Sequence, residues 1–312
     1  MTMRAIQVKS WADGPQELTS DKPATPSASQ IQLRMQAAGL HQVVRSRASG
    51  KHYSAQMLPH TVGIDGVGLD EATGTSYYIM GMAPDFGTFV DYVNVDKRAA
   101  VAVPKSVDPV ALAASVNPGM SSWMALTTRC TDLPPNFTVL ILGATTASGE
   151  LAASLSRRLG AGSIIGVARN VEALKKIDGL DRWIELKAGA GTDYSGLENV
   201  DVVLDYVYGD ATVHLLSSLP QGRPVQYVQI GSMSGQDAIA LPSAALRSKN
   251  LTLRGSGPGA WSIAELGQQM PKLIEALAGL TLKQPQKFPL EQFAKVWPDI
   301  ELAKKGRVVF TM

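Results

Sequence analysis

Residues 138–149 read Thr138-Val-Leu-Ile-Leu-Gly143-Ala-Thr-Thr-Ala-Ser-Gly149. The uninterrupted apolar run before Gly143 predicts a short strand that is buried on both faces of a parallel sheet. Beyond Gly149, apolar residues recur at helical spacing as far as Gly160, where left-handed backbone commonly ends a helix. Residues 163–167 predict a second buried strand. The order strand, glycine turn, helix and strand predicts half of a dinucleotide-binding fold.

The glycine turn indicates what this half-fold can bind. Gly143 lets the chain leave the strand sharply, and Gly149 lets the helix pack close to the sheet. Free N–H groups at the start of such a helix suit a pyrophosphate. The strict G-x-G-x-x-G pattern is incomplete, because Thr146 or Ala147 occupies the place of its middle glycine. A glycine turn also occurs without a ligand, so the motif alone leaves a purely structural turn open.

We expect six residues of this turn to contact the nucleotide: Gly143, Thr145, Thr146, Ala147, Ser148 and Gly149. The threonine hydroxyls can donate to phosphate in place of a close backbone approach.

The end of the second strand favours one nucleotide over another. A site for NAD needs an Asp or Glu there for the ribose hydroxyls, whereas a 2′-phosphate needs cationic donors. This strand ends in Arg169 and Asn170, with no acid. A guanidinium fork suits phosphate, and an amide can add a donor. A solvated side chain at a strand end is the alternative interpretation of Arg169, but at this position we favour selectivity for NADPH.

Alternating strands and helices continue after Asn170. Strands are predicted over 200–207, 224–230 and 251–254, with helices over 209–219 and 263–278. Ligands of open α/β sheets bind at the carboxyl ends of the strands. The residues expected to contact the cofactor there are Tyr206, Val207, Ile230, Gly231, Ser232, Gly255 and Ser256.

Residues 1–118 have a different pattern. Short segments with strand character recur, and in residues 30–36 apolar and polar residues alternate strictly. This predicts a compact antiparallel β domain. Helical pattern takes over between about residues 105 and 130, and a helix with one last strand near the C-terminus is expected to complete the first domain.

Composition excludes several classes of protein. The 312 residues are 45% hydrophobic and 18% charged, with a net charge of +2. The sequence contains no basic block and no long apolar run. We therefore expect no nucleic-acid or membrane partner and a cytosolic location. One cysteine, Cys130, rules out an internal disulfide, and the four histidines lack a metal-binding spacing, so we expect no metal. Cys130 is interpreted as a packed apolar side chain rather than a nucleophile.

Several motifs along the chain resemble one family. They are Ala38-Gly-Leu-His41, Arg47-Ala-Ser-Gly50-Lys-His-Tyr53, Gly63-Ile-Asp65-Gly-Val-Gly68, Gly87-Thr-Phe-Val-Asp-Tyr92, Ser121-Ser-Trp-Met-Ala-Leu126, the Gly143 turn and Gly306-Arg-Val-Val-Phe310. Together they resemble the zinc-free quinone oxidoreductase (ζ-crystallin-like) branch of the medium-chain dehydrogenase/reductase superfamily. The resemblance implies an α/β fold with a GroES-like β-rich catalytic domain (residues 1–118 and 260–312) and a Rossmann doubly wound parallel-sheet domain (residues 119–259).

The resemblance also implies a chemistry: NADPH-dependent, zinc-independent hydride transfer to a quinone or an activated C=C. The family's asparagine near the nicotinamide corresponds to His41, and a threonine of its cofactor site corresponds to Ser121. Relatives are commonly dimers through an exposed strand of the Rossmann sheet, so we expect a homodimer, with residues 224–230 or 251–254 as the edge.

Hydride addition to a quinone or enone creates negative charge on a carbonyl oxygen, which needs hydrogen-bond donors. His52 and Tyr53 are the candidate catalytic donors, followed by His41. Water can also deliver the proton. Two alternatives stay open: a specialised enoyl reductase of a biosynthetic pathway, and a non-catalytic NADPH-binding sensor or partner protein.

Overall fold

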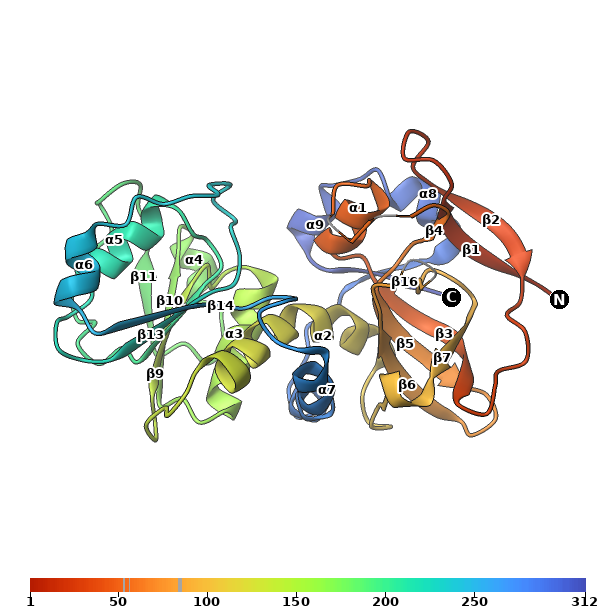
Figure 1. The fold of residues 1–312 in the computed structure, drawn as a ribbon, viewed down its shortest axis with the longest axis horizontal. Helices are drawn as coiled ribbons and strands as arrows, with labels where there is room; N and C mark the ends of the chain where they lie inside the picture. The colour runs from red at the N-terminus through yellow and green to blue at the C-terminus, as the bar shows by residue number, and fades with distance from the viewer. Residues whose placement is uncertain (53, 56, 84–85) are drawn as a thin grey trace. The chain divides into compact units, whose positions relative to one another are not determined.

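The computed structural model describes residues 1–52, 54–55, 57–83 and 86–312, and the chain divides into two compact units (Figure 1). The first unit comprises Met1–Asn117 and Met270–Met312, and the second comprises Pro118–Gln269. Both divisions fall inside helices, one in α2 (Pro109–Met124) and one in α7 (Ile263–Ala278). The predicted class, an α/β protein with one antiparallel-rich sheet and one parallel sheet, is confirmed.

The first unit is built on two sheets. The larger has seven strands in the order β15-β16-β3-β5-β6-β8, with β7 also paired to β3, and the smaller has the order β2-β1-β4. The strands are β1 (Thr2–Val8), β2 (Pro15–Asp21), β3 (Gln30–Gly39), β4 (His60–Thr61), β5 (Asp65–Asp70), β6 (Thr75–Met80), β7 (Tyr92–Asp96), β8 (Ala100–Ala102), β15 (Gln286–Pro289) and β16 (Val308–Thr311). The helices α1 (Gln42–Ala48), α8 (Phe293–Val296) and α9 (Leu302–Lys305) belong to the same unit. Because β16 pairs antiparallel with β3, the C-terminal segment completes this sheet.

The sequence explains the central pairing of this sheet. The alternation in β3 points Leu33 and Met35 into the core, as predicted. No sequence pattern predicts the neighbouring β5, because its glycines interrupt any alternation. A Cβ atom at Gly66 would lie 2.5 Å from the Ala37 carbonyl oxygen, and one at Gly68 would lie 2.9 Å from the Leu33 Cβ. The glycines therefore allow β5 to approach β3 closely.

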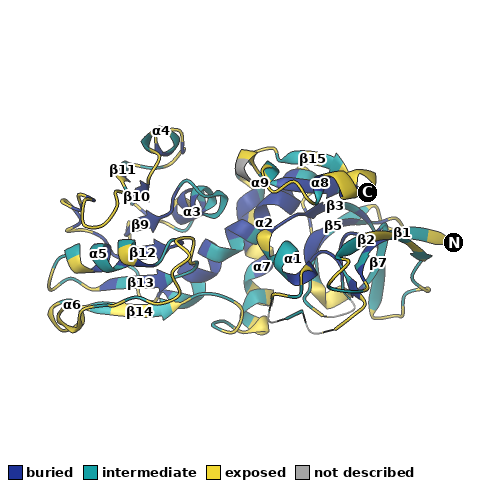
Figure 2. Cartoon of the chain, turned by 90° about the horizontal axis from the view of Figure 1, so that it is seen from above, coloured by how far each residue is buried: buried dark blue, intermediate teal, exposed yellow. Residues whose placement is uncertain are grey.

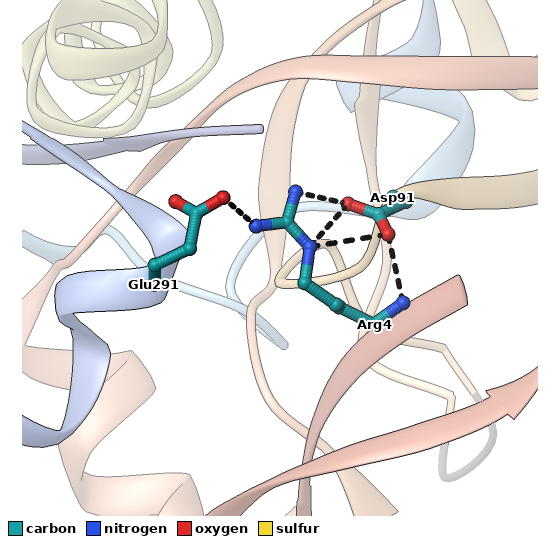
Figure 3. Close-up of polar contacts among 3 residues, drawn as sticks. All are labelled: Arg4, Asp91 and Glu291. Atoms are coloured by element: carbon teal, nitrogen blue, oxygen red, sulfur yellow. Dashed lines mark hydrogen bonds and ion pairs between the residues drawn. The ribbon is translucent and has the colours of Figure 1, made fainter.

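Ion pairing also ties the two ends of the first unit together (Figure 3). The Arg4 guanidinium donates from Nη2 to Asp91 at 2.7 Å and also contacts Glu291, and the Arg4 main-chain N–H donates to Asp91 at 2.7 Å. The hydrogen bond to Asp91 raises the pKa of Arg4. These contacts join β1 to the segment before β7 and to the segment that follows β15.

The second unit is a six-stranded, wholly parallel sheet in the order β11-β10-β9-β12-β13-β14. Its strands are β9 (Thr138–Leu142), β10 (Ser163–Ala168), β11 (Arg182–Glu185), β12 (Val202–Asp205), β13 (Val225–Gln229) and β14 (Leu251–Gly255), and its helices are α3 (Ala147–Arg158), α4 (Val171–Leu174), α5 (Asp210–Ser218) and α6 (Ser243–Ser248). With β9 as the first strand, this order is 3-2-1-4-5-6, the order of the dinucleotide-binding fold. Its topological switch point lies between β9 and β12, where such folds bind their ligand.

Burial in the parallel sheet follows the predicted apolar runs. All residues of β9 and β12 are buried, and so are all but the first of β10 (Figure 2). The predicted strand 200–207 is shorter in the structure, because the chain turns after Asp205 and Tyr208 adopts left-handed backbone with φ 61°. Strand β11 has no apolar run to predict it, since only Ile184 of its four residues is buried.

Candidate cofactor site and active-site residues

The turn between β9 and α3 has the geometry expected of a phosphate-binding turn. Gly143 adopts φ 97°, and its N–H donates to the Val167 carbonyl at 2.8 Å, so the chain bends directly at the end of the strand. At Gly149, an added Cβ would lie 2.4 Å from the Gly143 carbonyl oxygen and 2.7 Å from the Ala144 Cα. Only glycine therefore lets α3 start this close to the strand.

Thr146 caps α3 at its N-terminus. Its hydroxyl oxygen accepts a hydrogen bond from the Gly149 N–H at 2.9 Å, which leaves the hydroxyl proton available as a donor. The first N–H groups of a helix have no intrahelical acceptor, so those of Ala147 and Ser148 remain available to a ligand. Six residues predicted from the sequence, at positions 143 and 145–149, therefore belong to one turn that can receive an anion.

The end of β10 presents donors and no acid. Arg169 is exposed, and no described residue forms an ion pair or hydrogen bond with its guanidinium group. Asn170 caps α4 by accepting a hydrogen bond from the Ala173 N–H at 3.0 Å through its Oδ1, so its amide N–H groups remain donors. Lys175 and Lys176, which no sequence motif singles out, follow α4 directly. Lys175 forms an ion pair with Glu172 at 2.8 Å, so Lys176 is the one of the two that adds net positive charge here.

Two predicted cofactor residues contact each other. The hydroxyl groups of Ser121, in α2, and Tyr206, after β12, lie 3.1 Å apart. Ser121 donates its proton to the Pro118 carbonyl at 2.7 Å, so Tyr206 is the donor to Ser121. Burial raises the pKa of Tyr206 to about 12, which keeps the phenol protonated at neutral pH.

Asp205 holds the loop that follows β12, a role that no sequence motif indicates. The carboxylate is fully buried and accepts hydrogen bonds from the N–H groups of Val207 at 2.7 Å and Tyr208 at 2.9 Å. It also accepts from the hydroxyls of Thr212 and, at 2.8 Å, Tyr227. Four donors around one carboxylate fix the position of the loop that contains Tyr206 and Val207.

The loops after β13 and β14 lie at the same edge of the sheet, because parallel strands end together. The N–H groups of Ile230 and Gly231 both donate to the Asp205 carbonyl, at 2.8 and 3.1 Å. The Ser256 N–H donates to the Gln229 carbonyl at 2.8 Å. A hollow of about 530 Å³ is lined by two predicted residues, Ser232 and Gly255, together with Tyr208, Leu216, Tyr227, Gln229, Gln236, Asp237, Ile239, Leu241, Leu253 and Arg254.

In the first unit, His41 belongs to a buried polar cluster. Its Nε2 lies 3.1 and 3.3 Å from the two carboxylate oxygens of Asp65, which also accepts from the Tyr78 hydroxyl at 2.8 Å. Its Nδ1 lies 3.5 Å from Arg307 Nη1. A Cβ at Gly39 would lie 2.3 Å from His41 Nε2, so the glycine two residues before His41 makes room for the imidazole. Both ring nitrogens of His41 therefore face partners inside this unit.

His52 lies in the loop after α1. Its Nδ1 accepts from the Ser54 N–H at 3.2 Å and lies 2.8 Å from the Ser54 hydroxyl, so the proton of the neutral ring is on Nε2. Burial and the charge of Arg47 lower the pKa of His52, which favours the neutral imidazole. Tyr53, the other candidate donor of this loop, lies outside the described residues.

Cys130 is a packed side chain, as predicted. It is buried, and burial raises the pKa of its thiol to about 12. Among the described residues, no group of three or more His, Cys, Asp or Glu side chains could hold a metal ion. None of the described helices is both long enough and apolar enough to cross a bilayer.

The comparisons with known proteins agree with this geometry. No family model matches the chain. The chain is 36% identical to the probable NADPH-dependent quinone reductase tdiC of Emericella nidulans, over 98% of this chain and 99% of that protein.

Solved structures share the fold across the whole chain. A mycobacterial quinone oxidoreductase superimposes with a TM-score of 0.81 at 18% identity, covering 99% of this chain and 100% of that one. The quinone oxidoreductase of Thermus thermophilus, solved also with NADPH, gives 0.76 at 21% identity with 99% and 100% covered. Etr1p, solved with NADP and crotonyl-CoA, gives 0.80 at 16% identity with 100% of both chains covered.

The similarity to the Emericella protein over nearly the full length of both chains agrees with the 3-2-1-4-5-6 sheet and the glycine turn before α3. The chain therefore belongs to the quinone oxidoreductase branch of the medium-chain dehydrogenase/reductase superfamily.

Proposed function

We propose that the chain is a zinc-independent, NADPH-dependent oxidoreductase that reduces a quinone or an activated C=C bond of an enone or enoyl compound. The observation that carries the proposal is the position of the Gly149 turn and of Arg169: the turn follows β9 and Arg169 follows the neighbouring parallel strand β10, so both lie at the carboxyl edge of the sheet. The similarity to an NADPH-dependent quinone reductase supports the same cofactor and acceptor class.

The residues of the second unit fit this cofactor. A side chain at Gly149 would collide with the main chain of Gly143 and Ala144, so glycine lets α3 begin close to the turn, with its first N–H groups directed at the site proposed for the pyrophosphate. Arg169 offers a planar fork to a 2′-phosphate, and it has no carboxylate partner among the described residues. Ser121, Tyr206, Val207 and the residues after β13 and β14 would hold the nicotinamide half. When bound, NADPH supplies the hydride.

The acceptor needs donors for the negative charge that develops on its oxygen. We propose the side chains of His52 and Tyr53 for this role. His41 is the third candidate. Its two ring nitrogens already face Asp65 and Arg307, so a structural role at the N-terminus of α1 suits it better than a catalytic one.

Turnover assays test the acceptor class. Oxidation of NADPH is followed by nicotinamide absorbance with a panel of quinones and α,β-unsaturated carbonyl compounds, for wild type, His52→Ala and Tyr53→Phe. We expect one acceptor class to drive oxidation and both variants to lower kcat with little change in NADPH affinity. If the protein binds NADPH but no acceptor of the panel is reduced, the result supports the alternative of a non-catalytic sensor. If only enoyl compounds are reduced, the result supports the specialised pathway reductase.

We further propose a homodimer that forms through β14, in the cytosol. Among the described strands, β14 is an edge of the sheet and pairs with β13, and its Leu253 side chain is 42% exposed. Light scattering of Leu253→Glu tests the dimer, with Trp183→Glu as the control, because Trp183 is 45% exposed on the opposite edge strand β11. The proposal is supported if Leu253→Glu is a monomer while Trp183→Glu remains a dimer. It is opposed if the two variants have the same oligomeric state.

A further inference from the structure

The helix that contains Ser121 continues past α2 as a π-helical segment, Ala125–Arg129. The Cys130 N–H donates to the Ala125 carbonyl at 3.1 Å, an i→i+5 hydrogen bond that closes the wider turn. Single π-helical turns within helices occur frequently at functional sites, because the extra residue changes the direction of the side chains beyond it. Arg129 is the last residue of this segment.

Arg129 binds main-chain atoms on both sides of the loop that follows β14. Its Nε donates to the Gly255 carbonyl at 3.0 Å, and its Nη1 donates to the Ala260 carbonyl at 2.8 Å. The Arg129 carbonyl in turn accepts from Arg254 Nη1 at 2.6 Å. One guanidinium group therefore spans the loop 255–260, and its charge strengthens both hydrogen bonds.

The opposite side of the loop is held by β13. The Ser256 N–H donates to the Gln229 carbonyl at 2.8 Å, which extends the β13–β14 pairing by one residue. Within the loop, the Ala260 N–H donates to the Gly257 carbonyl at 2.9 Å. The loop is thus fixed at its start by β13 and at both ends by Arg129.

The sheet order indicates which half of the cofactor this loop faces. Each half of a dinucleotide-binding sheet holds one mononucleotide. Arg169 follows β10 and is proposed to bind the 2′-phosphate of the adenosine half, so β12, β13 and β14 belong to the half that takes the nicotinamide. This step rests on the proposed function.

We propose that Arg129 is a positioning residue, which fixes the loop 255–260 against the nicotinamide half of bound NADPH without contributing to phosphate binding. Its removal frees two carbonyl groups and lets the loop shift. A misplacement of about 1 Å can lower a rate by about 100-fold when the reacting geometry is lost. The pyrophosphate turn and Arg169 are not contacted by Arg129, so NADPH affinity is retained.

The test compares Arg129→Ala, Arg129→Lys and the control Arg158→Ala, whose side chain is exposed at the end of α3. Four quantities are measured: the melting temperature, the Kd for NADPH, the emission wavelength of the bound nicotinamide, and kcat with KM for the best acceptor. Emission reports the surroundings of the nicotinamide and needs no turnover.

For Arg129→Ala we expect a Kd within about threefold of wild type, loss of the emission shift seen on wild-type binding, and a kcat lower by about tenfold or more. Arg129→Lys should recover part of the shift and of kcat, because its ammonium can donate to one of the two carbonyls. Arg158→Ala should match wild type in every measurement.

The proposal is overturned if Arg129→Ala retains the wild-type emission shift and kcat, or if its NADPH affinity falls in step with its melting temperature, as a purely structural role predicts. If Arg129→Ala does not fold, Arg129→Lys alone decides: a wild-type emission shift and kcat overturn the proposal. A wild-type protein that does not bind NADPH refutes the proposed function itself, and this is seen before any variant is compared.

Discussion

Replacing Gly149 with alanine perturbs the start of α3 by an amount that the structure defines. The added Cβ would lie 2.4 Å from the Gly143 carbonyl oxygen, and real Cβ contacts essentially never fall under 3.0 Å, so the helix start or the turn must move by about 0.6 Å. The three nearest contacts are all with main-chain atoms, of Gly143 and Ala144, so no flexible side chain can absorb the movement.

This movement acts on the N–H groups that we propose for the pyrophosphate. Lengthening an N–H···O contact from about 2.9 Å by this amount brings it to the limit of a hydrogen bond. Each hydrogen bond to a charged group contributes roughly 1.5–3 kcal/mol, so one lost contact raises the Kd for NADPH about 10- to 100-fold. Overpacking of this kind also lowers the free energy of unfolding by about 1–3 kcal/mol.

The assay is fluorescence titration of Gly149→Ala with NADPH, together with urea unfolding. Gly267→Ala is the matched control, because Gly267 lies in α7 and a Cβ there would meet nothing within 4 Å. The control should keep wild-type affinity and gain about 0.5–1 kcal/mol in stability. If Gly149→Ala binds NADPH as the control does, the close approach of α3 to the turn has no role in binding.

Three further predictions concern buried polar groups of the second unit. Asp205→Asn places an amide N–H₂ group among four hydrogen-bond donors. The free energy of unfolding should therefore fall by about 2–4 kcal/mol. A fall of less than about 0.5 kcal/mol would contradict the role of Asp205 in holding its loop. Tyr206→Phe removes the donor to Ser121, so we expect the free energy of unfolding in urea to fall by roughly 0.5–1.5 kcal/mol. In a double-mutant cycle, Ser121→Ala should cost less in the Tyr206→Phe variant than in wild type, and equal costs in the two would contradict their coupling. Because burial raises the pKa of Cys130 to about 12 in the folded chain, the unfolded thiol loses its proton first and stability should fall by about 1.4 kcal/mol per pH unit above about pH 9. Unfolding of Cys130→Ala should lack that part of the slope, and identical slopes in both proteins would contradict the pKa.

The central unit of the parallel sheet could be predicted because its signals are local. A buried apolar run, a glycine turn and a helical repeat are contained within residues 138–168, and the structure forms β9, α3 and β10 there. The place of Arg169 directly after β10 could also be predicted, because the apolar run of this strand ends at Ala168.

Other features depend on contacts between distant residues, and no local pattern reports them. Asp205 stands at what the sequence presents as an ordinary strand end, and its role comes from donors as far along the chain as Tyr227. Arg129 is joined to Gly255, 126 residues later, by a side-chain hydrogen bond to the main chain, and a π-helical turn has no sequence signature. Strand β5 could not be predicted, because its close packing against β3 requires glycine at positions 66 and 68, and these glycines interrupt the alternation of apolar and polar side chains that indicates a strand.

The most direct test of the account is the ratio of Kd for NADH to Kd for NADPH, measured in wild type and in Arg169→Ala. Charge-assisted hydrogen bonds from Arg169 to a 2′-phosphate should make wild type prefer NADPH by about 10-fold or more, and Arg169→Ala should remove this preference by weakening NADPH alone. Equal affinities in wild type, or a preference that survives in Arg169→Ala, would contradict the assignment of Arg169 and of the edge after β9 and β10 as the NADPH site.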